Sequence, residues 1–370
     1  MYTLLVKTLS GFESLLADDI RTYGGEILSV QNRSVTCRGD FKTVVELNVH
    51  SGVAMYVYVK IGEFGALSRE EYLRKSQTIP FETYLATEQT FAIRSDVYDC
   101  PWIDNSMYAS LLLKDAVADI QRTHAGKRSN VDIRRPDIEL YQYIYNDQIS
   151  IYVNSSGEPL YKRGYKTLTA KAPVNEILAH GILRLAGFTG DRTFINPFCG
   201  SGTFVSEAIL MSEKKSPNLY RKHFSFSNFK GHPFHDYWKQ MTYTSHRGKS
   251  VSFYGIDKDA KAIEIAKKSL LSICPKSPVQ LEVCDFFSWP NPVGEAFMIM
   301  NVPYNQRFKI EPLSFFSQLG KVLKQKFSGS ECWILSAGKQ HTKHLGLRSS
   351  LTIPLYNGQL QVFLQQFKIY

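Results

Sequence analysis

The chain has 370 residues, of which 44% are hydrophobic and 21% are charged, and its formal net charge is +10. This composition is ordinary for a globular protein and excludes disordered and fibrous classes, while the length favours two or more domains. The positive charge fits an anionic partner such as nucleic acid, although a basic surface without such a role gives the same number.

The first part of the chain alternates strand patterns with helical spacing. Residues 4–6 and 34–37 are typical of strands, whereas apolar residues within 12–20 and 41–47 recur at helical spacing. We therefore expect a small α+β unit with its helices on one face of a sheet.

A second α+β unit follows, from about residue 55 to about residue 153. A helical pattern runs through residues 111–120 and ends at Gly126. The strand patterns of this unit lie at residues 91–94, 131–133, 138–140 and 149–153. A basic connector at residues 161–166 comes next, and longer βα units after it predict a doubly wound parallel sheet.

Residues 212–250 form one irregular insertion that is rich in aromatic and basic residues. Such a mixture is suited to stacking on RNA bases and neutralising phosphates. We favour the alternative that the rings pack into the core, because large apolar side chains are usually buried. The aromatic residues in question are Phe224, Phe226, Phe229, Phe234, Tyr237 and Trp238.

Residues 193–203 (Thr-Phe-Ile-Asn-Pro-Phe-Cys-Gly-Ser-Gly-Thr) are the strongest local pattern and predict a strand, a glycine turn and a helix. Gly200 and Gly202 let the backbone approach a ligand closely, and the start of the helix offers unpaired N–H groups. Ligands of open α/β sheets bind at such strand ends. The turn alone is compatible with a dinucleotide, with S-adenosylmethionine or with no ligand.

Two acidic residues end the strand patterns that follow. Asp257 is placed to accept hydrogen bonds from ribose hydroxyls, and Asp285 to accept one from an adenine amine. Each alone is as readily a helix N-cap, but two in succession after a glycine turn favour a nucleoside ligand. A nicotinamide enzyme expects glycine where Val205 stands and an acid about 20 residues later, so the spacing argues against a dinucleotide.

The most informative feature is a strand pattern that ends in Asn301-Val302-Pro303-Tyr304. The lone pair of an exocyclic base amine is delocalised, so a catalyst must accept hydrogen bonds from its N–H groups as positive charge develops. The Asn301 side chain and the Val302 carbonyl are suitable acceptors, because Pro303 keeps Val302 extended. Tyr304 is suited to stacking on a base that has left its helix.

The C-terminal region predicts a β-hairpin, because Asn357-Gly358 separates two alternating apolar runs. Two histidine pairs, His232/His235 and His341/His344, lack further ligands, so we expect no metal. The six cysteines form no Cys-x-x-Cys pair, which favours reduced thiols in a cytoplasmic protein. No apolar stretch has the length of a membrane span, so we expect no membrane partner.

With these motifs the chain resembles the THUMP-domain RNA methyltransferases, and within them the bacterial 23S rRNA guanine-N2 methyltransferase branch. Residues 196–203 match the cofactor loop of that family, which usually begins with Asp, and residues 301–304 match its Asn-Pro-Pro-Tyr motif. Val302 replaces a proline, and Asn305 stands where glycine is usual. Further matches lie at residues 114–116, 136–138, 161–165, 172–176 and 354–360.

The resemblance covers almost the whole chain and implies an α/β fold with three domains. They are an N-terminal ferredoxin-like domain at residues 1–54, completed by the linker 155–166, a THUMP RNA-binding domain at 55–154, and a Rossmann-like class I methyltransferase domain at 167–370. It implies S-adenosylmethionine as cofactor, bound by Asn196, Pro197, Phe198, Gly200, Ser201, Gly202, Thr203, Asp257 and Asp285.

The implied activity is methyl transfer to a guanine N2 amine, in 23S rRNA, by Asn301, Val302, Pro303 and Tyr304. An adenine-N6 DNA methylase, a tRNA guanine-N2 methyltransferase and a non-catalytic RNA-binding protein remain as alternatives. Together with the THUMP resemblance, the basic residues predict RNA contacts at Lys127, Arg128, Arg134, Arg135, Lys162, Arg163 and Lys166.

Overall fold

A computed structural model describes residues 1–166, 174–241, 251–275, 279–302 and 312–370. The chain divides into two compact units. The first unit consists of Met1–Thr8, Leu16–Leu160 and Lys222–Thr242, and the second of Leu9–Leu15, Tyr161–Arg221 and Tyr243–Tyr370.

The described part of the first unit is built on one eight-stranded sheet with the order β2-β3-β1-β4-β8-β7-β5-β6. Strand β4 pairs with both β1 and β8, so a single sheet runs through the whole unit. Its strands are β1 (Tyr2–Lys7), β2 (Glu26–Gln31), β3 (Ser34–Gly39), β4 (Tyr56–Gly65), β5 (Thr90–Tyr98), β6 (Asn130–Val131), β7 (Ile138–Tyr145) and β8 (Gln148–Asn154).

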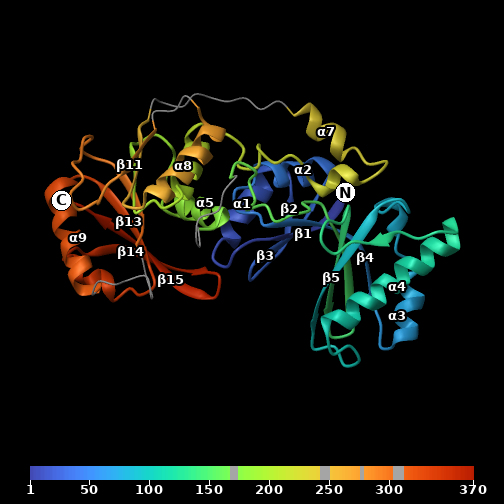
Figure 1. Ribbon diagram of the computed structural model, residues 1–370. Helices are drawn as coiled ribbons and strands as arrows, with labels where there is room; N and C mark the ends of the chain where they lie inside the picture. Colours follow the sequence, from blue (N-terminus) through green and yellow to red (C-terminus); the bar gives the residue numbers. More distant parts are fainter. Residues whose placement is uncertain (167–173, 242–250, 276–278, 303–311) are drawn as a thin grey trace. The chain divides into compact units, whose positions relative to one another are not determined.

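The helices of the first unit begin and end at residues suited to those positions. Asp40 and Asn105 cap α2 and α4 by accepting from backbone N–H groups, and Gly126 ends α4 with a φ of 69°. Figure 1 shows α3 and α4 beside β4 and β5. The helices are α1 (Glu13–Thr22, shared with the second unit), α2 (Phe41–His50), α3 (Arg69–Ser76), α4 (Ser106–Ala125) and α7 (Phe234–Gln240), with short 3-10 turns η1 (Phe81–Thr83) and η2 (Ser225–Asn228).

Four of the six aromatic residues named in the insertion pack into the core, as we favoured, whereas Tyr237 and Trp238 are half-buried. Phe224, Phe226, Phe229 and Phe234 are all buried. The Phe224 and Phe226 rings stack at a centroid distance of 5.1 Å. The segment that holds them belongs to the first unit, where it adds η2 and α7.

The second unit is built on a seven-stranded sheet with the order β11-β10-β9-β12-β13-β15-β14 among the described residues. Its strands from β11 to β13 pair in parallel, and β15 and β14 add an antiparallel hairpin whose turn holds Gly358 at a φ of 66°. The strands are β9 (Phe194–Pro197), β10 (Phe253–Asp257), β11 (Val279–Val283), β12 (Phe297–Asn301), β13 (Glu331–Ser336), β14 (Ser349–Asn357) and β15 (Leu360–Lys368).

The second unit also contains α5 (Glu176–Leu185), α6 (Thr203–Ser212), α8 (Ala260–Ile273), α9 (Pro312–Lys326) and the 3-10 turn η4 (His341–Leu345). The chain passes from β9 through β10 to β11 in one direction, and β12 and β13 lie on the other side of β9. The carboxyl ends of β9 and β12 therefore meet where the strand order reverses, which is where open α/β sheets bind ligands. The predicted parallel sheet and C-terminal hairpin are confirmed.

Two strand predictions need correction in their extent. The strand expected at residues 131–133 is only the short β6, Asn130–Val131. The strand expected to end at Asp285 ends at Val283, and Asp285 lies in the turn beyond it. Its carbonyl accepts from the N–H groups of Ser288 and Trp289, and this local turn replaces the strand ladder.

Candidate active site

The side chain of Asn196 joins the carboxyl ends of β9 and β12. Its Nδ2 donates to the backbone carbonyl of Ile299 over 2.7 Å, and the residue is only 1% exposed. Its Oδ1 is buried and has no hydrogen-bond partner among the described residues. An ionised aspartate at this position could not donate to the Ile299 carbonyl, because a carboxylate has no N–H group. The side-chain amide of Asn196 can donate, which explains why asparagine suits the site. The cofactor contact expected of Asn196 stays a prediction.

The turn after β9 bends through residues with positive φ, namely Phe198 (56°), Gly200 (54°) and Gly202 (74°). A phenylalanine with positive φ is strained, and packing of its ring on Phe286, at a centroid distance of 5.6 Å, helps to hold it. No described atom lies within 4 Å of the position that a Cβ on Gly200 would take. A Cβ on Gly202 would lie 2.9 Å from that of Ala266, so this glycine permits helix packing.

Asp257, at the end of β10, shapes the same turn. Its Oδ2 accepts from the Gly200 N–H over 2.8 Å, and its Oδ1 accepts from the Asp259 N–H over 2.9 Å. Each carboxylate oxygen keeps a further lone pair, so both remain able to accept a ribose hydroxyl. Helix α6 begins at Thr203 without a side-chain cap. Open space at Gly200, uncapped N–H groups and a strand-end carboxylate fit a nucleoside cofactor that also carries an anionic group.

Asp285 lies in the turn just beyond the neighbouring strand β11. The Cys284 N–H donates to the Asp257 carbonyl over 3.0 Å, which links the two strand ends directly. The Asp285 side chain is exposed, and its Oδ1 accepts from the Phe287 N–H over 3.0 Å. The structure therefore brings both predicted acids to one edge of the sheet, beside the glycine turn.

Asn301 is the last residue of β12 and pairs with Leu335 of β13. The residue as a whole is half-buried, yet its Oδ1 is buried and has no hydrogen-bond partner in the described part of the chain. Leaving such an acceptor unsatisfied costs about 1–3 kcal/mol, so we expect a donor from outside the described residues. Val302 is 1% exposed. Pro303, Tyr304 and Asn305 lie outside the described residues.

The thiol of Cys199 is unsuited to nucleophilic chemistry. Burial raises its pKa well above the ordinary value, and the negative charge of Asp257 raises it further. Because the thiolate is the reactive form, we do not expect Cys199 to act as a covalent nucleophile.

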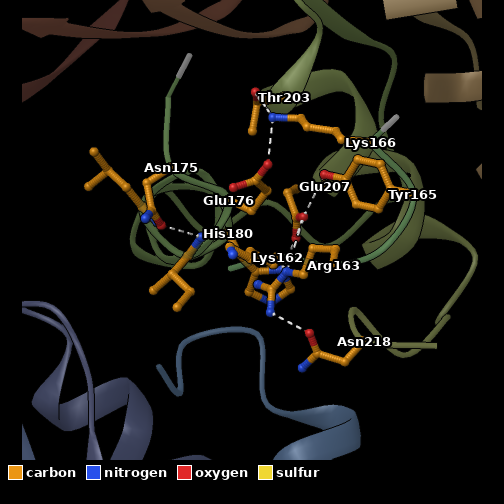
Figure 2. A network of polar contacts seen from close by, with 12 residues as sticks. Lys162, Arg163, Tyr165, Lys166, Asn175, Glu176, His180, Thr203, Glu207 and Asn218 are labelled. Carbon is orange, nitrogen blue, oxygen red and sulfur yellow. Dashed lines mark hydrogen bonds and ion pairs between the residues drawn. The ribbon is translucent and has the colours of Figure 1, made fainter. Parts of the chain in front are cut away.

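A buried polar network joins the connector at residues 161–166 to α5 and α6 (Figure 2). Glu207 on α6 accepts from the Tyr165 hydroxyl over 3.0 Å and from His180 Nδ1 over 2.9 Å, and Arg163 Nε lies 3.5 Å from its Oε1. Burial alone would raise the pKa of Glu207, but Arg163 and the two hydrogen bonds hold it below the ordinary value. The sequence motifs do not single out Glu207 and His180, although an acid within the apolar run 204–210 indicates a buried charge.

Two residues expected to bind RNA belong to this network instead. Arg163 is 2% exposed, and its Nη1 donates to Asn218 Oδ1 over 3.0 Å, so the prediction that it contacts RNA phosphates is wrong. Lys166 Nζ donates to Thr203 Oγ1 over 2.8 Å and lies 2.6 Å from Glu176 Oε1. Lys166 therefore supports the first residue of α6 next to the glycine turn, which is a structural role that its charge alone did not suggest.

The other predicted RNA contacts are at the surface. Lys127 and Arg128 follow the end of α4, and Arg134 and Arg135 precede β7. All four are exposed, as is Lys162. Lys127 Nζ lies 3.4 Å from a carboxylate oxygen of Glu88, a distance at which an exposed pair is easily exchanged for a phosphate.

Within the described ranges, no cluster of three or more histidine, cysteine, aspartate or glutamate side chains has the geometry of a metal site. Over the same ranges, no helix combines the length and the apolar character needed to cross a membrane.

Three known domain families match consecutive parts of the chain. Residues 3–58 match the RlmL ferredoxin-like domain, residues 69–154 the THUMP domain, and residues 163–366 the RMKL-like methyltransferase domain. These matches confirm the expected fold class and domain types.

Similar proteins have been described in several bacteria. A Synechocystis protein provisionally named as an RNA methyltransferase is 29% identical over 97% of this chain and 95% of its own length. The ribosomal RNA large subunit methyltransferase K/L of Syntrophotalea carbinolica is 30% identical over 97% of this chain but only 52% of its own. The chain thus spans about half the length of the K/L relatives it matches.

Solved structures agree with the fold over the whole chain. SMU.472, described as a methyltransferase and crystallised with SAH, superposes with a TM-score of 0.86 at 22% identity, covering 100% of this chain and 98% of the other. A Listeria monocytogenes protein, described by prediction as an N6-adenine-specific DNA methylase, gives 0.87 at 21% identity, covering 100% and 96%. The methyltransferase family match extends over more than half of the chain. The chain therefore belongs to the RMKL-like methyltransferases, as an S-adenosylmethionine-dependent enzyme with a ferredoxin-like and a THUMP domain.

Proposed function

We propose that the chain methylates the N2 amine of a guanine in RNA, and that this RNA is 23S rRNA. The observation that carries the chemistry is the buried, unsatisfied Oδ1 of Asn301 at the end of β12. Within the described residues this oxygen has no hydrogen-bond donor, and it lies at the point where the strand order reverses. An exocyclic amine is the donor that fits, because its N–H groups become more acidic as the nitrogen attacks the methyl group and gains positive charge.

The residues of this chain position the reaction rather than take part covalently. The target guanine leaves its stack and presents N2 to Asn301 Oδ1, with the Val302 carbonyl as a second acceptor. The roles of Pro303 and Tyr304, in fixing that carbonyl and stacking on the base, rest on the sequence motif. Asn196 supports the arrangement by tying β9 to β12 two residues before Asn301.

The cofactor site is proposed at the glycine turn. Gly200, Gly202 and the N–H groups at Thr203 hold the amino-acid end, while Asp257 accepts from the ribose and Asp285 from the adenine amine. The other assigned residues are Asn196, Pro197, Phe198 and Ser201. When bound, S-adenosylmethionine supplies an electrophilic methyl group. The buried Asn196 and the half-buried Phe198 limit the access of bulk water to the strand ends.

The choice of RNA as substrate is supported by the THUMP match, by the net charge of +10 and by the names of the relatives. The exposed residues Lys127, Arg128, Arg134, Arg135 and Lys162 are its proposed phosphate contacts. The domains proposed from the sequence are residues 1–54, 55–154 and 167–370, with 155–166 completing the first; in the structure Tyr161–Arg221 belongs to the second unit and Lys222–Thr242 to the first. The free state of all six cysteines supports action in the cytoplasm.

The test is to identify the methylated product. The purified chain is incubated with labelled S-adenosylmethionine and either rRNA from cells lacking the protein, tRNA, or double-stranded DNA, and the nucleosides are separated by mass spectrometry. We expect N2-methylguanosine from 23S rRNA. N2-methylguanosine from tRNA alone, or N6-methyladenine from DNA, would replace this proposal by the corresponding alternative. Cofactor binding with no transfer to any substrate would favour an RNA-binding role.

A further inference from the structure

Residues 332–370 contain no Asp or Glu. Besides Lys368 in β15, they contain three cations in or next to η4, namely Lys339, Lys343 and Arg348. All three are exposed, and none of them forms an ion pair within the described residues. A polyanion can bind a cation that forms no ion pair without first displacing a carboxylate.

These cations are held on a firmly anchored segment. The Thr342 hydroxyl of η4 donates to Gln365 Oε1 of β15 over 2.8 Å, and the Lys343 N–H donates to the Gln340 carbonyl over 3.3 Å. Lys324 of α9 reaches the same segment, because a Cβ on Gly346 would lie 2.9 Å from its Nζ. The hydrogen bond of Thr342 thus ties the turn that carries Lys343 to β15.

A hollow of about 310 Å³ lies between η4 and the hairpin β14–β15. This volume is roughly that of ten water molecules, enough for a hydrated phosphate group. Besides the two lysines, the hollow is lined by the polar residues Gln340, Thr342, Ser349 and Gln365 and by the apolar residues Leu347 and Phe367.

The position of this segment connects it to the candidate active site. Strand β13 runs parallel to β12 with Leu335 opposite Asn301, so both strands end at the same edge of the sheet. Lys339 follows Leu335 by only a few residues. With at most about 3.6 Å per residue and about 5 Å between strands, its Cα lies within about 19 Å of that of Asn301. A lysine side chain at this distance reaches the backbone of nucleotides that adjoin a base held at Asn301.

We propose that Lys339 and Lys343, with Lys324 and Arg348 beside them, bind the phosphodiester backbone of the RNA next to the target nucleotide. This site lies in the methyltransferase domain and is separate from the THUMP domain. It rests on the proposed function, because it takes RNA as the substrate. Its role is to hold the strand around the target once the THUMP domain has captured the molecule.

The test measures RNA affinity as a function of salt, using the full-length chain and a fluorescent RNA stem-loop with a guanine in its loop. The double variant Lys339→Gln/Lys343→Gln is compared with Lys261→Gln/Lys267→Gln, which removes two exposed cations from α8. If each proposed lysine neutralises one phosphate, the first variant lowers the slope of log affinity against log salt by about two between about 50 and 200 mM salt. The α8 variant leaves the slope unchanged.

Equal slopes for the wild type and the Lys339/Lys343 variant, both folded and both able to bind S-adenosylmethionine, would overturn this inference. So would an equal loss in the α8 variant, because it would mean that the surface attracts RNA without a defined site. RNA that binds with the expected slopes but acquires no N2-methylguanosine counts against the proposed function alone. The two ideas can thus fail separately.

Discussion

Replacing Glu207 by glutamine tests whether the buried network stabilises the methyltransferase domain. The variant keeps the size of the side chain but removes the charge beside Arg163, whose side chain is 1% exposed. Loss of one partner of a buried ion pair costs about 3–5 kcal/mol, because the remaining charge stays buried without compensation. The matched control is Glu264→Gln on α8, whose partner Lys268 lies 2.7 Å away in an exposed pair worth about 0–1 kcal/mol.

Unfolding by urea, followed by tryptophan fluorescence, measures both variants at several pH values. Because the pKa of Glu207 is lowered in the folded state, its contribution is present above the unfolded-state pKa and is lost as the pH falls through the folded-state value. The difference between wild type and Glu207→Gln is therefore largest near neutral pH and shrinks in acid. A Glu207→Gln protein as stable at pH 7 as Glu264→Gln would refute this account of the network.

Two substitutions in the candidate active site and one among the proposed RNA contacts give further tests. Asp257→Ala weakens S-adenosylmethionine binding by about 1.5–3 kcal/mol in calorimetry, and Asp257→Asn by less because one acceptor for the Gly200 N–H remains; equal affinities for all three proteins would contradict the assignment. Cys199→Ala leaves the single-turnover rate unchanged, since the buried thiol stays protonated; a large loss of rate would contradict a positioning mechanism. Arg134→Gln lowers the salt slope of RNA binding by about one, whereas an unchanged slope would remove it from the RNA contacts.

The arrangement of the second unit was predictable because its signals are local. The strand, turn and helix at residues 193–203 were predictable because a tight turn needs positive φ, which Gly200 and Gly202 adopt without strain. Gly358 indicates the hairpin turn for the same reason. The order of such βα units then predicts where their carboxyl ends meet. Asp257, Asp285 and Asn301 all fall at that edge for this reason.

The features that could not be predicted depend on contacts between distant residues. In the sequence, nothing distinguishes Arg163 from a surface cation. In the structure it is buried beside Glu207 and Asn218, which come much later in the chain. The continuous sheet of the first unit likewise depends on β4 pairing with β1 on one side and β8 on the other, which no local pattern specifies. Alternation predicts which face of a strand is buried, but it does not identify the neighbouring strand.

The most direct test of the central claim is the single-turnover rate of methyl transfer to the guanine N2 of 23S rRNA by Asn301→Ala. Loss of one preorganised acceptor in the transition state is expected to lower the rate by about 10²–10³, while the affinity for S-adenosylmethionine changes far less. Calorimetry on the same preparation checks the second half of this statement. A folded Asn301→Ala protein that transfers methyl groups at nearly the wild-type rate would contradict the account.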